Sequence, residues 1–148
     1  MAKNPPPCVS FATTIMVRDS CLCLHAQRAA RALARRFDEA FRALGLTNQQ
    51  FSLLMALNRP APPRMAPVAS LLAMDRTTLT AALKPLERRG LVKVTPDPAD
   101  KRGKLLTLTA SGSALLAKAA PIWIREHAAV ENLVAGGDRL RVDLLALS

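Results

Sequence analysis

The side chains of this sequence that are best suited to chemistry are basic and hydroxyl groups within residues 75–104. Such groups hydrogen-bond to phosphate oxygens and to the edges of nucleic-acid bases. The candidates are Arg76, Thr77, Thr78, Thr80, Lys84, Arg88, Lys101, Arg102 and Lys104. Residues 75–104 hold eight Lys and Arg against four Asp and Glu, whereas residues 105–148 hold four of each. This distribution predicts a basic surface that binds a polyanion.

A short helix over residues 76–88 is predicted to present the first six of these side chains. Asp75 is a good N-cap, because its carboxylate can accept free amide hydrogens of the first turn. Leu79, Leu83 and Leu86 give the helix one apolar face. The opposite flank is small, hydroxylated and basic, which suits a DNA major groove. Pro85 is expected to bend the helix or make it irregular. An ordinary amphipathic surface helix is the alternative.

A β-hairpin is predicted directly after this helix. Gly90 fits the helix C-cap, and residues 91–95 and 104–108 have the pattern of two short strands. The intervening PDPADKRG forms a tip that carries Lys101 and Arg102, which suit a minor groove or the phosphate backbone. Asp100 is expected to stabilise this wing by holding Arg102 in one rotamer. A merely solvated charged turn is the alternative.

Two further helices are predicted upstream. Residues 65–72 form the first helix of a helix-turn-helix, with a tight turn at residues 73–74. Thr47 and Gln50 form a capping box that begins another helix, which a proline-rich stretch at residues 60–63 follows. The order of elements is therefore helix, helix-turn-helix and β-wing.

With these elements in this order, the chain resembles the MarR (multiple antibiotic resistance regulator) family of winged-helix repressors. The matching segments are LGLTNQQFSLLMAL at 44–57, VASLLAMDRTTLTAALKPLERRGLV at 68–92 and DKRGKLLTLTASG at 100–112. The resemblance implies a homodimer, a nearly palindromic double-stranded DNA operator and regulation by a small-molecule effector or an oxidant. Many relatives have a basic residue where Ala81 stands, so the sequence preference of those relatives cannot be transferred to this chain.

The composition agrees with a DNA partner. The formal net charge is +10 and the pI is near 10.8, which favours binding to a polyanion. Only 3% of residues are aromatic and Tyr is absent, which argues against RNA or single-strand binding by base stacking. A chain of 148 residues fits one domain of ordinary size.

The predicted fold class is mainly α with a small β-wing, in which the winged helix-turn-helix occupies residues 46–109. Residues 1–19 are expected to be an arm that is disordered or packs on a partner subunit. Residues 20–45 and 110–148 are expected to be dimerisation helices, with a kink at Pro121. Apolar positions that the winged helix is not expected to cover support this assignment; they are Leu22, Leu33, Phe37, Ile122 and Leu144. Burial of the first long helix inside a monomer is the alternative.

Five residues are candidates for a ligand or redox site: Cys21, Cys23, His25, Trp123 and His127. The two cysteines stand at the expected start of a helix, where the reactive thiolate is favoured, and resemble the sensing cysteine of the organic-hydroperoxide branch of the family. That branch surrounds its cysteine with tyrosines, which this chain lacks. Buried inert cysteines and metal binding with the histidines are the alternatives, although no recognised metal motif is present.

We therefore expect a cytoplasmic, sequence-specific double-stranded DNA-binding regulator, a repressor, with no enzymatic activity, cofactor or metal. The apolar run at residues 8–17 is too short to span a membrane. No catalytic motif is present. A nonspecific architectural DNA-binding protein, a thiol-based peroxide sensor and a protein-interaction module that has lost DNA reading remain as alternatives.

Overall fold

The computed structural model describes residues 8–148, which form two units. The described part of the first unit, residues 8–35, contains helix α1 (Phe11–Ser20) and most of helix α2 (Leu22–Phe41). Ser10 caps α1 by accepting the Thr13 amide. Residues 11–19 of the segment expected to be an arm therefore lie in a helix, and the packing of this arm on a partner subunit stays a prediction. The expectation for residues 1–7 lies outside the described part.

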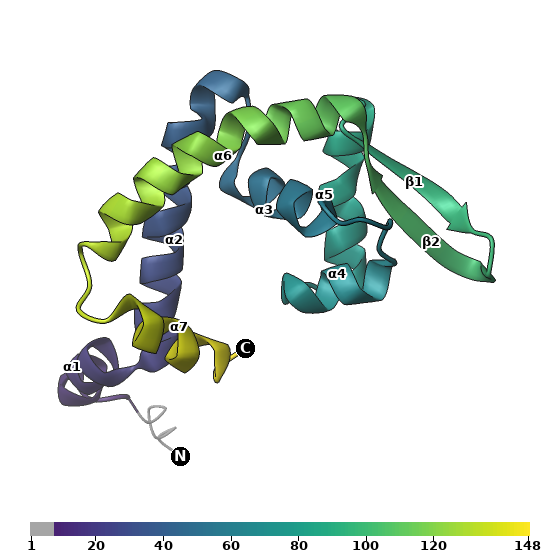
Figure 1. Ribbon diagram of the computed structural model, residues 1–148. Coiled ribbons are helices and arrows are strands. Elements are labelled where there is room, and N and C mark those ends of the chain that lie inside the picture. The colour runs from purple at the N-terminus through teal and green to yellow at the C-terminus, as the bar shows by residue number, and fades with distance from the viewer. Residues whose placement is uncertain (1–7) are drawn as a thin grey trace, which may run out of the picture. The chain divides into compact units, whose positions relative to one another are not determined.

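The second unit, residues 36–148, is helical apart from one hairpin (Figure 1). After the end of α2 come the 3-10 helix η1 (Arg42–Leu44) and helices α3 (Asn48–Leu57), α4 (Met65–Leu71) and α5 (Arg76–Arg88). Strands β1 (Val92–Asp97) and β2 (Asp100–Leu108) form the hairpin, and helices α6 (Ala110–Glu131) and α7 (Gly137–Leu145) follow. The predicted fold class, mainly α with a β-wing, is confirmed.

Local capping fixes where these helices begin. Thr47 and Gln50 form the predicted capping box at α3. Thr109 caps α6 by accepting the Gly112 amide, and its hydroxyl donates to the Gly90 carbonyl. Gly90, in the left-handed region at φ 68°, ends α5 as predicted. Gly112 is required for packing, because a Cβ there would lie 2.1 Å from the Leu91 carbonyl oxygen.

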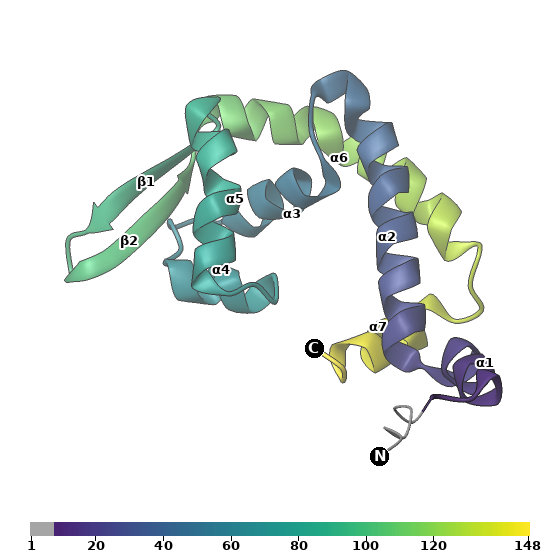
Figure 2. The same ribbon diagram turned by 180° about the vertical axis from the view of Figure 1, so that it is seen from behind.

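Helix α3 lies between α6 and α4 in both views (Figures 1 and 2) and supplies the centre of the core. The largest fully buried side chains are Phe41, Leu53, Leu54, Leu79, Leu83, Leu86, Leu106 and Val68. Phe37 is also buried, at 7% exposure, and its ring lies near that of Phe41. The expectation that the winged helix cannot cover Phe37 is therefore wrong, because the last turns of α2 belong to its core.

The wing is longer than the sequence indicated. The strands pair in antiparallel register from Val92 opposite Leu108 to Pro96 opposite Lys104, with an irregularity before Asp97. Pro96 is tolerated because β1 is an edge strand. The sequence predicted that Lys101 and Arg102 lie in an open hairpin tip. This was wrong, because both residues lie in β2. The free edge of β2 is extended by the segment before α4, through the Leu106 amide and the Pro63 carbonyl.

Both helix-interior prolines lie inside continuous helices. Helix α5 runs through Pro85 and α6 runs through Pro121. Figures 1 and 2 show α6 changing direction part-way along its length, which is consistent with the bend expected at Pro121. None of the helices within residues 8–148 combines the length and apolar character needed to cross a bilayer.

Candidate nucleic-acid interface

The first turn of α5 is held in place by Asp75. Its carboxylate accepts the Thr78 backbone N–H at 2.7 Å and the Thr78 hydroxyl at 2.7 Å. These bonds, the backbone bond first, lower the pKa of Asp75 below its usual value. The carboxylate therefore stays ionised and caps the positive end of the helix.

The flank of α5 opposite its buried leucines is exposed. Arg76, Thr77, Thr78, Thr80, Lys84 and Arg88 are all solvent-accessible, as the sequence predicted. Five residues of this flank line a shallow groove of about 350 Å³, namely Arg76, Thr77, Thr80, Ala81 and Lys84. Its small side chains leave room for a base edge, and its two cations lie where phosphates would flank it.

A second groove, of about 430 Å³, separates α5 from the wing. Thr80 and Lys84 contribute from the helix, and Lys101, Arg102 and Lys104 contribute from β2. The sequence-predicted basic residues of helix and wing are thus brought to one place. A groove with cations on both walls suits a phosphate backbone.

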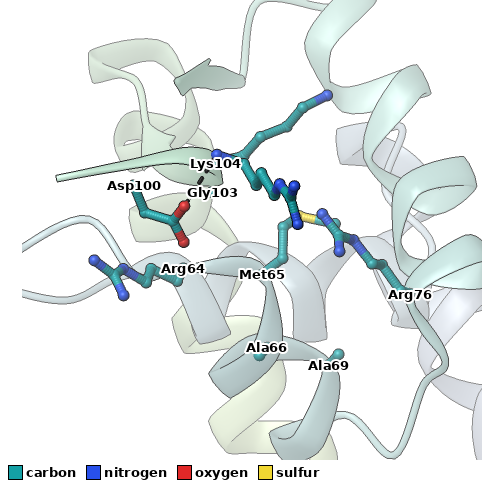
Figure 3. Close-up of a pocket in the computed structure, with 9 residues that line it drawn as sticks. Arg64, Met65, Ala66, Ala69, Arg76, Asp100, Gly103 and Lys104 are labelled. Atoms are coloured by element: carbon teal, nitrogen blue, oxygen red, sulfur yellow. Dashed lines mark hydrogen bonds between the residues drawn. The ribbon is translucent and has the colours of Figure 1, made fainter. Parts of the chain in front are cut away.

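A third groove, of about 470 Å³, lies where the wing meets the helix-turn-helix (Figure 3). Its apolar floor is made by residues of α4 that include Met65 and Ala66, and Arg76 reaches toward Met65. Arg64 and Asp100 lie on another side, and Lys104 borders the groove from β2. Arg88 lines none of the three grooves, so it is not grouped with the other candidates.

Asp100 stabilises the wing differently from the way the sequence predicted. Its carboxylate accepts the backbone N–H of Arg102 at 3.0 Å, drawn as a dashed line in Figure 3. No ion pair joins the two side chains among residues 8–148, so the expected hold on the Arg102 rotamer is wrong. Gly103 allows this turn, because a Cβ there would crowd Asp97 and Asp100 at 3.1–3.3 Å.

The sequence did not reveal the ion pair between Arg64 and Asp97. Asp97 is the buried acid of the wing, with a side chain that is 5% exposed. Its Oδ1 accepts the Ala99 N–H at 2.9 Å, and its Oδ2 lies 2.7 Å from Arg64 Nε. Asp97 followed by proline indicates a turn in the sequence. Nothing indicates that Arg64 pairs with Asp97, because Arg64 precedes α4 and is distant in sequence.

The candidate redox residues lie in the first unit. Cys21 Sγ accepts the Leu24 amide at 3.4 Å at the start of α2, and the Cys21 carbonyl lies 2.8 Å from His25 Nδ1. Cys23 accepts a hydrogen bond from the Gln27 side chain at 3.0 Å. Cys23 and Cys8 are exposed and Cys21 is half-buried, so the cysteines are not buried as that alternative required, and the redox role of Cys21 and Cys23 stays a prediction. Within residues 8–148, no three His, Cys, Asp or Glu side chains group as metal ligands would.

The candidate ligand residues of the second unit lie on α6. Trp123 stacks on His127 with ring centroids 4.5 Å apart, and its ring centroid lies 6.4 Å from that of Phe51. Trp123 lines an apolar pocket of about 500 Å³ with residues of α3, α4 and α6. His127 does not line it and lies 3.8 Å from Glu131. His25 belongs to the other unit, and its expected grouping with Trp123 stays a prediction.

Comparison with known proteins agrees with this geometry. A family model described as the MarR family matches residues 44–103, which span α3, the helix-turn-helix and most of the wing. The M. tuberculosis transcriptional regulator MosR, solved in complex with DNA, is 40% identical over 86% of this chain and 93% of that one, with a TM-score of 0.80. The chain belongs to the MarR family.

Two curated relatives match about half of this chain. The transcriptional activatory protein BadR of Rhodopseudomonas palustris is 40% identical over 56% of this chain and 49% of its own length. The transcriptional repressor NicR of Pseudomonas putida is 39% identical over 48% of this chain and 45% of its own. The match to this chain thus spans about half the length of these curated relatives, and one is named an activator and the other a repressor.

Proposed function

We propose that this chain is a sequence-specific, double-stranded DNA-binding transcription regulator. The observation that carries the proposal is the exposed, hydroxylated and basic flank of α5 beside a basic wing. In this proposal α5 enters the major groove, and Lys101, Arg102 and Lys104 of the wing contact phosphates or a minor groove. The relative MosR was solved in complex with DNA, which supports DNA as the partner of this chain. Repression, rather than activation, is the direction we propose.

We further propose that the active species is a homodimer. Helix α7 and the residues after it expose apolar side chains, including Val142 at 62%, Leu145 at 72% and Leu147 at 67%. A single chain gains nothing from leaving such side chains in water, and a second copy would cover them. Two α5 helices related by a two-fold axis would meet successive major grooves about 34 Å apart. The operator would then be nearly palindromic.

Footprinting on genomic fragments of the source organism tests this function. A regulator protects discrete, inverted half-sites, whereas an architectural protein coats fragments without preferred positions. Arg102→Ala should weaken binding to all fragments and reduce the salt dependence of log K by about one unit, as one lost phosphate contact requires. Protection without preferred positions would favour the architectural alternative. An unchanged salt dependence would remove Arg102 from the interface.

A pocket in the second unit supports the proposal that a small molecule releases the protein from DNA. The pocket beside Trp123 is almost wholly apolar, and its lining includes Phe51, Met55, Leu71 and Ile124. It joins α6 to α3 and to the end of α4, so an occupant would contact both the helix-turn-helix and the helix that follows the wing. Trp123→Ala should abolish release by a ligand without changing affinity for DNA in its absence.

Release by an oxidant is the alternative, and Cys21 and Cys23 carry it. Both thiols accept a hydrogen bond, Cys21 from the Leu24 amide and Cys23 from the Gln27 side chain. Cys21→Ser and Cys23→Ser should each prevent release of DNA by an organic hydroperoxide, while Cys8→Ser should not. Equal release from all three variants would reject thiol sensing.

A further inference from the structure

Helix α5 carries three threonines on its exposed flank, Thr77, Thr78 and Thr80. A threonine hydroxyl has one hydrogen to donate and two lone pairs to accept with. Whether a threonine can act as a donor to a base therefore depends on whether its hydrogen is already used within the protein.

Two of the three hydroxyl hydrogens are used. The Thr78 hydroxyl donates to Asp75 Oδ2 at 2.7 Å, and the lowered pKa of Asp75 means that its carboxylate can only accept. The Thr80 hydroxyl donates to the Arg76 carbonyl one turn earlier, also at 2.7 Å. Both threonines can still offer a methyl group or a lone pair, but neither has a free hydrogen.

The third hydroxyl is free. Within residues 8–148, the Thr77 side chain has no hydrogen-bond partner, and it lies exposed in the first turn of α5. It lines the same shallow groove as Ala81, the position one turn later, whose small side chain keeps the space beside Thr77 open. Thr80 and Ala81 are exposed as well, so this part of the helix is open to solvent.

We infer that Thr77 is the specificity-determining threonine of α5, and that its hydroxyl donates to a base edge in the major groove. The acceptors there are N7 and O6 of guanine, N7 of adenine and O4 of thymine. Thr78 and Thr80 contribute shape: their methyl groups suit the thymine methyl, and their hydroxyl hydrogens stay within the helix. This inference rests on the proposed function and identifies which side chain reads the sequence.

Isosteric substitution tests it, because valine keeps the shape of threonine and removes the hydroxyl. The full-length protein selects its preferred sequence from a duplex library with a randomised centre, and that duplex is then the probe. Thr77→Val should bind the selected duplex about 3–10-fold more weakly per half-site, as expected for one lost hydrogen bond. It should also lose its preference at one base pair of each half-site. Thr77→Ser, which restores the hydroxyl, should recover that preference.

Thr80→Val keeps the methyl group and shape that Thr80 offers to the groove and removes a hydroxyl whose hydrogen is already used within the helix, so base preference should be kept. Thr14→Val, at an exposed threonine of the first unit outside the three grooves, is the matched control and should change neither affinity nor base preference. Binding to random duplex at low salt should be the same for all variants, which shows that each is folded. Thr78→Val loses a capping bond and should lower thermal stability without altering base preference. The inference is overturned if Thr77→Val keeps the wild-type preference, or if Thr78→Val or Thr80→Val loses it. Failure of the wild-type protein to select any sequence would instead overturn the proposed function itself.

Discussion

Removal of the Arg64 guanidinium should loosen the wing. Arg64→Gln leaves Asp97 with a carboxylate that is 5% exposed and has lost its cation at 2.7 Å. The pair is a charge contact without hydrogen-bond geometry, because Asp97 Oδ2 has no hydrogen-bond partner among residues 8–148. Leaving a buried carboxylate without its charge partner costs about 1–3 kcal/mol. Arg64 itself is 54% exposed, so solvent screens the pair and the lower half of that range, about 1–2 kcal/mol, is the expected loss of unfolding free energy.

Urea unfolding at low salt and one fixed protein concentration measures this loss, because urea does not screen the ion pair and the stability of a dimer depends on concentration. Arg59→Gln is the matched control. It removes the same charge from the same loop, and its side chain donates to the Ala56 carbonyl instead of to an acid. Asp97→Asn and the double variant complete a thermodynamic cycle, in which the two losses should be clearly less than additive.

The wing should also lose protection in amide hydrogen exchange before the rest of the second unit. If Arg64→Gln and Arg59→Gln unfold at the same denaturant concentration, and the cycle is additive, the pair contributes nothing and the reasoning fails. A lower stability with unchanged exchange in β1 and β2 would place the effect elsewhere than in the wing.

Three further predictions follow from the described contacts. Gly112→Ala should destabilise strongly, by about 3 kcal/mol or more, because its Cβ would meet the Leu91 carbonyl oxygen at 2.1 Å; a thermal melt within a few degrees of wild type would contradict this. The pKa of Asp75 is lower in the folded protein than its value near 3.8 in the unfolded chain. Its ionised carboxylate therefore stabilises the fold fully at a pH above the unfolded pKa, and this stabilisation is lost as the pH falls through the folded pKa. Asp75→Asn should therefore flatten the acid limb of stability against pH in urea unfolding, and an unchanged limb would remove Asp75 as a contributor. Deletion from Gly137 onward should lower dimer stability and DNA affinity together; a truncated monomer by sedimentation that binds DNA as tightly as the full chain would overturn the assembly.

The features that sequence predicts well here are local. The caps at Thr47 and Asp75 each depend on a side chain and an amide three residues away, so residue type and spacing suffice. The wing shows the limit of the approach. Pro96 argued for an interruption, but its strand is an edge strand where a proline is tolerated, and so β1 continues to Asp97.

Long-range contacts account for most of what the sequence missed. Nothing near Asp97 indicates that it is buried or that Arg64 reaches it, because the pair forms only when the segment before α4 lies along β2. Phe37 and Leu33 share an apolar helix face, yet one is 7% and the other 40% exposed. Periodicity gives the face of a helix, but not the point along it where the core ends.

The stack of Trp123 against His127 makes this protein its own spectroscopic reporter. Trp123 is the only tryptophan and tyrosine is absent, so long-wavelength ultraviolet emission arises from a single indole. That indole lines the apolar pocket on α6 and lies in contact with one titratable ring, and through Phe51 it approaches the buried core of α3. Entry of a molecule into the pocket, or protonation of the imidazole, would therefore change one signal that needs no added label.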